Sequence, residues 1–170
     1  MNVIPTVSPR SRVAVPAAWT TAVIVAVALL GQRATDLGPW YQALKQPWWK
    51  PPDLAFGPAW TLIYLLTGTA VVRAWLAMEG PDGPRARRRF LAAAGLNAVL
   101  NVLWSWLFFR LRRPDWALAE VVLLWLSVVL LAVLSARHSS SAAWLFAPYA
   151  IWVAFAATLN AGVVRLNGPF

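Results

Sequence analysis

The stretch Phe90–Phe109 reads FLAAAGLNAVLNVLWSWLFF and contains twenty residues without a charged side chain. A helix of that length spans about 30 Å, the thickness of the hydrocarbon core of a bilayer. Arginine clusters within 85–89 and 110–113 bracket it on both sides. Such basic flanks are typical of the loops beside a transmembrane helix. The stretch therefore predicts a membrane-spanning helix.

Four further apolar blocks of similar length lie along the chain, which is 60% hydrophobic and only 12% charged. This composition suits lipid better than water. We predict an all-α, polytopic membrane protein, a bundle of five transmembrane helices integral to a membrane that the sequence does not identify. The predicted organisation is an N-terminal tail, 1–14, and one domain, 15–167, with spans at about 15–32, 56–78, 90–109, 116–135 and 142–164.

The first block, Val13–Leu30, also fits a cleavable signal peptide, because Arg10 and Arg12 precede it and small residues lie near its end. Its apolar run is long for a signal sequence, so we prefer a span and keep the signal peptide as the alternative. Five spans place the termini on opposite faces, with the first loop on the side of the C-terminus. Eight basic residues on one face against seven on the other leave the orientation open.

The formal net charge of +9 does not indicate nucleic-acid binding, because the basic residues lie in short clusters between apolar blocks. Cysteine is absent, which excludes disulfides and thiolate sites. The single histidine, His138, lies in a polar stretch without a second imidazole or a carboxylate cluster. No metal site is predicted, and we expect this histidine in a solvated loop.

Few polar side chains lie within the predicted spans. Asn97 and Asn101 are four residues apart, hence on one helix face, and Asn160 lies in the last span. Amides in hydrocarbon need hydrogen-bond partners, so all three should point into the bundle, either to join helices or to line a cavity. Glu120 is the one acidic residue within a span. We expect it in the headgroup zone, with proton coupling as the alternative.

Twelve tryptophans are far more than the interfacial belts of so short a chain require. Trp60, Trp104, Trp125 and Trp152 fall within spans, where they suit either a planar aromatic ligand or plain packing. The first loop is also aromatic, and its prolines within 47–52 restrict its conformations. Such a rigid loop at one mouth of a helix bundle predicts a lid.

Five ordered motifs resemble the TspO/MBR family of tryptophan-rich sensory proteins, which includes the mitochondrial translocator protein. The first-loop segment Trp40–Pro52, WYQALKQPWWKPP, is similar to the family pattern W-Y-x-x-L-x-K-P-x-W-x-P-P. The other similar segments are Phe56–Tyr64, Asn97–Ser105 with Phe108-Phe109, Trp116–Glu120, and Pro148–Ala156. The resemblance covers residues from about 15 to 167.

The resemblance implies a five-helix membrane protein, often a homodimer, that binds porphyrins and haem-related tetrapyrroles in a cavity beneath the first loop. No cofactor is required, since porphyrin or haem would be the ligand. By motif position Tyr41, Trp60, Asn101, Trp152 and Ala156 would line the cavity. The full set of candidate ligand-binding residues also includes Trp49, Asn97, Trp104 and Tyr149.

Three functions stay open after this comparison. The first is a tetrapyrrole-binding sensor, receptor or carrier in porphyrin and stress regulation. The second is an enzyme that degrades porphyrin in light, with Trp60 and Trp152 as its candidate catalytic residues. The third, a small proton-coupled exporter, would need an acidic group at mid-membrane. Ala161 replaces an aromatic residue of the family's sterol-recognition pattern, so strong sterol binding is not predicted.

The third span carries the small residues Ala94, Gly95 and Ala98. Small residues let two helix backbones approach closely within a membrane. We therefore predict a homodimer through this helix, with membrane lipid as the other partner.

Overall fold

The computed structural model describes residues 9–170. Residues 1–8 of the predicted tail, and the side chains of Arg10 and Arg12, lie outside the described part. Five long helices make up the fold: α1 (Pro9–Ala34), α3 (Phe56–Ala77), α4 (Gly83–Ser105), α5 (Pro114–Ala136) and α7 (Ala147–Asn167). Each belongs to a segment long and apolar enough to cross a membrane, which confirms the predicted five-helix bundle and a multi-pass integral membrane protein.

Four short helices connect or extend the long ones: α2 (Pro39–Ala43), η1 (Asp53–Ala55), η2 (Trp106–Arg110) and α6 (Ser140–Trp144). The π-helical turn η2 continues α4 at its C-terminal end. A turn separates α6 from α7, where the sequence predicts one continuous span. Pro148 lies in the first turn of α7, where a missing backbone N–H is tolerated, so the helix restarts there.

The α4 helix begins earlier than its predicted span. It starts at Gly83, so the cluster from Arg85 to Arg89 forms the first turns of the helix rather than a loop. Arginine has a high helix propensity, so the helix can continue beyond the apolar block. The arginines therefore project from a helix end that extends beyond the apolar block.

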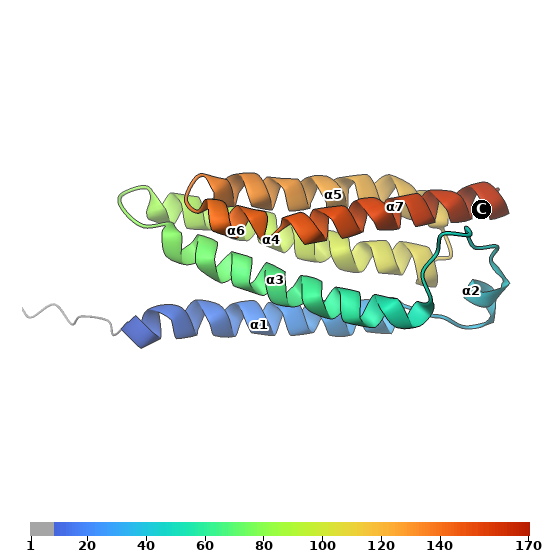
Figure 1. Cartoon of the computed structure of the whole chain (residues 1–170), viewed down its shortest axis with the longest axis horizontal. Coiled ribbons are helices and arrows are strands. Elements are labelled where there is room, and N and C mark those ends of the chain that lie inside the picture. The colour runs from blue at the N-terminus through green and yellow to red at the C-terminus, as the bar shows by residue number, and fades with distance from the viewer. Residues whose placement is uncertain (1–8) are drawn as a thin grey trace, which may run out of the picture.

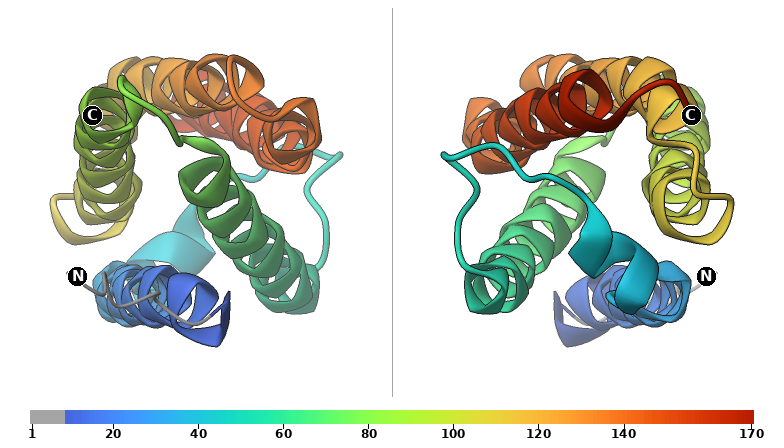
Figure 2. Two further views of the ribbon diagram at one scale, coloured as in Figure 1. Left: turned by 90° about the vertical axis from the view of Figure 1, so that its left-hand side faces the viewer. Right: turned by 90° about the vertical axis from the view of Figure 1, so that its right-hand side faces the viewer.

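The long helices follow the order α1, α3, α7, α5, α4 around the bundle, with α4 returning to α1 (Figure 2). The start of α1 and the C-terminus lie at opposite ends of the bundle, and the first loop with α2 lies at the end of the C-terminus (Figure 1). This arrangement agrees with the predicted topology.

The packed core lies among α3, α4, α5, α6 and α7, where Phe90, Phe146 and Val153 are almost completely buried. In contrast, no residue is buried in the most apolar part of α1. The α1 helix therefore contacts α3 and α4 without filling the space between them. This loose packing leaves two cavities inside the bundle.

Candidate functional site

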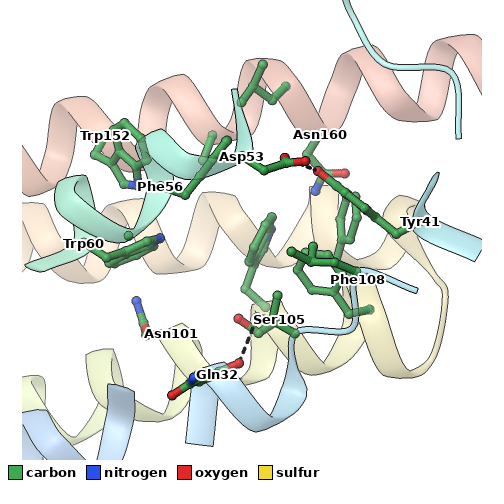
Figure 3. A pocket seen from close by; sticks show the side chains of 18 of the residues that line it. Gln32, Tyr41, Asp53, Phe56, Trp60, Asn101, Ser105, Phe108, Trp152 and Asn160 are labelled. Carbon is green, nitrogen blue, oxygen red and sulfur yellow. Dashed lines mark hydrogen bonds between the residues drawn. The ribbon is translucent and has the colours of Figure 1, made fainter. Parts of the chain in front are cut away.

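The larger cavity, called the main cavity below, has a volume of about 460 Å³. It lies at the first-loop end of the bundle between α1, α3, α4 and α7 (Figure 3). Six of the nine predicted binding residues line it: Tyr41, Trp60, Asn101, Trp104, Trp152 and Ala156. Residues from four helices and the first loop thus meet around one space large enough for a small-molecule ligand.

The other three predicted residues lie outside the wall of the main cavity. Trp49 packs edge-on against Trp48, with ring centroids 5.6 Å apart, and its ring lies beside Gly162 on α7. Asn97 and Tyr149 line the smaller cavity, called the second chamber below. Asn97 lies one helical turn deeper than Asn101, and the Tyr149 ring is buried behind Trp60. Motif membership alone does not reveal this difference in depth.

Trp60 and Trp152 form one continuous aromatic wall. Their ring centroids are 6.4 Å apart and their planes meet at 81°, so the rings contact each other edge to face. Tyr64 stacks on Trp60, and Phe56 packs edge-on against Trp152. This contact leaves no room for a ligand between the two indoles. A flat ligand can only lie against the wall that they share.

A buried hydrogen-bond network connects α4, α5 and α7 beneath this wall. The Asn101 side-chain amide donates to the Tyr149 hydroxyl at 2.9 Å, and that hydroxyl donates to the side-chain oxygen of Asn97 at 3.5 Å. Asn97 in turn donates to Ser127 at 2.8 Å. Asn160 can bond the Pro114 carbonyl and the Leu118 N–H, each at 3.0 Å, at the start of α5.

All three asparagines therefore point into the bundle, as predicted, and at least 93% of each residue is shielded. The sequence left helix joining and cavity lining as alternatives for them. Asn101 does both, because it bonds α7 and also lines the main cavity. Asn97 joins helices and lines only the second chamber.

The first loop covers the main cavity as a lid. The Tyr41 ring packs on Phe109, and the Trp40 ring meets Phe108 edge-on. Asn167 on α7 accepts from the Lys45 backbone N–H at 2.8 Å and donates to the Lys45 carbonyl at 2.9 Å. These contacts hold the loop against the ends of α4 and α7, as expected for a lid.

Gly162 on α7 allows the lid to approach closely. A Cβ atom at this position would lie 3.0 Å from Cγ of Pro47. A larger side chain would therefore push the loop away from α7. This contact shows why a glycine occupies the interior of a helix at this point.

Three polar residues of the first-loop region lie at the rim of the main cavity. The Lys50 ammonium lies 2.5 Å from the Asp53 carboxylate, and the Tyr41 hydroxyl donates to the same carboxylate oxygen at 3.4 Å. Burial raises the pKa of Tyr41, so its phenol stays protonated. Burial acts to lower the pKa of Lys50, but the hydrogen bond to Asp53 and the neighbouring charges raise it above its usual value. Lys50 is therefore cationic at neutral pH.

The sequence did not reveal several other residues of the cavity wall. They are Gln32 on α1, Gln46 and Asp53 in the first-loop region, Phe56 and Tyr64 on α3, and Ser105 on α4. The spacing of Lys50 and Asp53 could have indicated an ion pair. No pattern in α1 marks Gln32, because its position depends on how that helix tilts against the bundle.

Glu120 and Trp125 are the two remaining side chains that the sequence singled out within the spans. The placement of Glu120 in the headgroup zone stays a prediction, and the structure adds that its side chain is buried, with 6% of the residue exposed and no hydrogen-bond partner for either carboxylate oxygen. It lies about 9 Å along α5, on the face that packs into the bundle. Trp125 lines neither cavity, because its indole N–H donates to the Ala150 carbonyl at 3.1 Å.

The chemistry of the main cavity is that of a binding site. Its wall offers aromatic faces, the Asn101 amide and one cation at the rim. Within residues 9–170, no three His, Cys, Asp or Glu side chains gather as metal ligands would. The arrangement can hold a flat apolar molecule that carries an anionic group at its edge.

Comparison with known proteins agrees with this architecture. The TspO/MBR family model matches residues 17–166. The chain is 37% identical to the tryptophan-rich protein TspO of Archaeoglobus fulgidus, over 79% of this chain and 84% of that protein. It is 36% identical to a tryptophan-rich sensory protein of Cereibacter sphaeroides, over 75% of this chain and 77% of that protein. It is 37% identical to the translocator protein of Sus scrofa, over 75% of each. The family model includes residues of all five long helices, and the chain belongs to the TspO/MBR family.

Proposed function

We propose that the protein binds a tetrapyrrole, a porphyrin or haem, in the main cavity and acts as a membrane sensor, receptor or carrier for it. The observation that carries this proposal is the aromatic wall formed by Trp60 and Trp152 beneath a fitted lid. A tetrapyrrole is flat, apolar and conjugated, so it gains most from aromatic faces that are removed from water. Trp104 and Phe108 add further aromatic surface from α4.

The polar groups of the cavity suit the edge of such a ligand. Natural porphyrins carry carboxylates on their periphery. Lys50 provides a cation at the rim of the cavity, where it can meet a carboxylate of a macrocycle bound inside. The side-chain nitrogen of Gln46, which also lines the cavity, is buried without a hydrogen-bond partner. Buried amide donors usually have partners, so this nitrogen is available to a ligand acceptor.

The names of two relatives support the proposed role. One is called a sensory protein and another a translocator protein. Neither name specifies a ligand, so the ligand class rests on the cavity itself. The proton-coupled exporter gains no support, because Glu120 lines neither of the two cavities.

A titration of the purified full chain in detergent tests the proposal. Protoporphyrin, haem and cholesterol are each added while intrinsic tryptophan fluorescence is recorded. We expect saturable quenching by protoporphyrin and haem at one ligand per chain, and much weaker binding of cholesterol. Repeating the titration under illumination tests porphyrin degradation, which would appear as a loss of porphyrin absorbance that requires the protein.

Two matched variants connect the signal to the main cavity. Ala156 lines the cavity one turn after Trp152, whereas Ala154 is exposed on the outer side of the same helix. Ala156→Phe should fill the space and lower porphyrin affinity at least tenfold, while Ala154→Phe should leave it unchanged. Equal affinities in the two folded variants would place the ligand elsewhere and overturn the proposal.

A further inference from the structure

We infer that the acyl chain of an anionic membrane phospholipid occupies the second chamber. This chamber has a volume of about 150 Å³ and lies between α1, α3 and α4, in the half of the bundle away from the first loop. An apolar cavity of that size stays dry and accepts hydrocarbon groups. The inference does not depend on the ligand of the main cavity.

The wall of the chamber offers a lipid chain an apolar surface. Val23, Ile24, Val71 and Leu131 line it. Its polar members are mostly engaged within the protein, because the Asn97 amide bonds Ser127 and the Asn101 amide bonds Tyr149. Thr67 also lines the chamber, and its hydroxyl oxygen is buried without a partner.

Two residues separate the chamber from the main cavity. Tyr64 and Asn101 line both spaces, so they form the wall between them. Asn101 is held in that wall by its 2.9 Å hydrogen bond to Tyr149. A ligand of the main cavity and an occupant of the chamber can therefore be present together.

The chamber is closed between α1 and α3 and open between α1 and α4. On the α3 side, a Cβ atom at Gly68 would lie only 3.0 Å from the Ile24 side chain. On the α4 side, the lining residues Trp19 and Leu91 are 72% and 51% exposed. The surface around this opening lies within the membrane-spanning segments, where lipid chains and not water form the solvent. A chain that enters there gains contacts that an empty cavity lacks.

Charge at this end of the bundle selects the headgroup. Arg88 is exposed and lies one helical turn before Leu91, hence on the same side of α4. Arg85 and Arg89 are exposed beside it, and none of these three arginines forms an ion pair within the described residues. Clusters of arginine at a helix end attract anionic headgroups. A lipid chain in the chamber therefore places its phosphate close to this cluster.

Photo-crosslinking of the full chain in lipid nanodiscs tests the inference. The probe is phosphatidylglycerol with a diazirine at mid-chain, compared with phosphatidylcholine that carries the same chain. Mass spectrometry then locates the labelled residues. We expect labels on Ile24 and Val71 inside the chamber, severalfold more from phosphatidylglycerol than from phosphatidylcholine. Equal yields from the two lipids would overturn the assignment of an anionic headgroup.

Matched variants distinguish the chamber from the general lipid-facing surface. Ala98 lines the chamber, whereas Ala92 is exposed on another face of the same helix and lines neither cavity. Ala98→Phe should abolish labelling of Ile24 and Val71, and Ala92→Phe should preserve it. Unchanged labelling in a folded Ala98→Phe protein would overturn the inference.

Two further arms identify the occupant. Thr67→Val makes the wall more apolar without changing its shape, so labelling should persist; loss of labelling would mean that a polar ligand binds the Thr67 hydroxyl. Saturating protoporphyrin should also leave the labels in place. Complete displacement by protoporphyrin would show that the chamber is an extension of the main cavity and not a lipid site.

Discussion

The amide of Asn101 on α4 and the hydroxyl of Tyr149 on α7 are joined by a hydrogen bond of 2.9 Å between the main cavity and the second chamber. The Tyr149 hydroxyl also donates to Asn97, so it acts as donor and acceptor between α7 and two residues of α4. Because Asn101 faces the main cavity, this bond fixes the orientation of an amide that a ligand would meet. The hydrogen bonding between α4 and α7 and the shape of the site are thus connected through one hydroxyl group.

The first prediction concerns the strength of this hydrogen bond. Tyr149→Phe removes the hydroxyl without changing the ring, and Asn101→Ala removes its donor. Hydrogen bonds between membrane helices contribute on the order of 0.6–2 kcal/mol. Thermal unfolding in detergent of the two single variants and the double variant should give a coupling energy within that range. Additive effects would show that the bond contributes nothing to stability.

The second prediction concerns Lys50 and the charge of the ligand. If Lys50 meets a porphyrin carboxylate, Lys50→Gln should weaken protoporphyrin binding about fivefold, as expected for loss of roughly 1 kcal/mol. Asp53→Asn removes the competing carboxylate, so it should preserve or improve binding. Fluorescence titration measures both affinities.

Two controls make the test of Lys50 specific. Lys45 is also in the first loop but does not line the main cavity, so Lys45→Gln should have no effect. A porphyrin without carboxylates should bind the Lys50→Gln protein as well as the unchanged protein. Equal weakening for both porphyrins would show that Lys50 supports the lid and not the ligand.

Hydropathy was enough to predict the five helices, because the cost of burying unpaired backbone groups in lipid leaves a long apolar segment few other structures. The same reasoning did not predict that Glu120 is buried. Its place near the start of α5 indicated a depth in the membrane, but helix rotation decides whether such a side chain faces lipid or protein. Packing of α5 against its neighbours turns Glu120 inward.

In the site, too, features set by spacing within one helix were predicted, and features set by packing between helices were not. Motif positions identified Trp60, Trp152 and Ala156, because residues one turn apart share a helix face whatever the rest of the fold does. The sequence predicted neither the position of Gln32 in the cavity wall nor the second chamber, because both depend on how loosely α1 packs. The contact between the two indole rings also depends on the crossing of α3 and α7, which no spacing in the sequence records.

The third prediction concerns the homodimer, whose interface the described single chain does not test. The structure places Ala94 and Ala98 in the wall of the second chamber, while Gly95 is exposed, and a Cβ atom added to it would meet no atom within 4 Å. A partner helix could therefore approach at Gly95. Gly95→Leu should convert dimers to monomers, as measured by light scattering in detergent, and a dimer that survives this change would lie on another helix.

The last prediction concerns the aromatic wall on which the proposed function rests. Trp60 and Trp152 share one surface of the main cavity, and each ring contacts a further aromatic residue of that wall, Trp60 contacting Tyr64 and Trp152 contacting Phe56. An aromatic contact contributes on the order of 1 kcal/mol beyond the burial of its area, which corresponds to about a fivefold change in affinity. We expect Trp60→Phe and Trp152→Phe each to weaken protoporphyrin binding by at least that factor, or to abolish its consumption in light.

Trp116 provides the matched control for these two substitutions. It is exposed at the start of α5, where the Arg113 guanidinium lies 4.2 Å from its ring centroid, and it does not line the main cavity. Trp116→Phe should therefore leave porphyrin affinity unchanged. Because Trp60 and Trp152 touch, the double variant should lose less affinity than two independent contacts would. Equal losses from all three single substitutions, in protein with unchanged helicity, would mean that the indoles serve packing alone and that the tetrapyrrole site lies outside this wall.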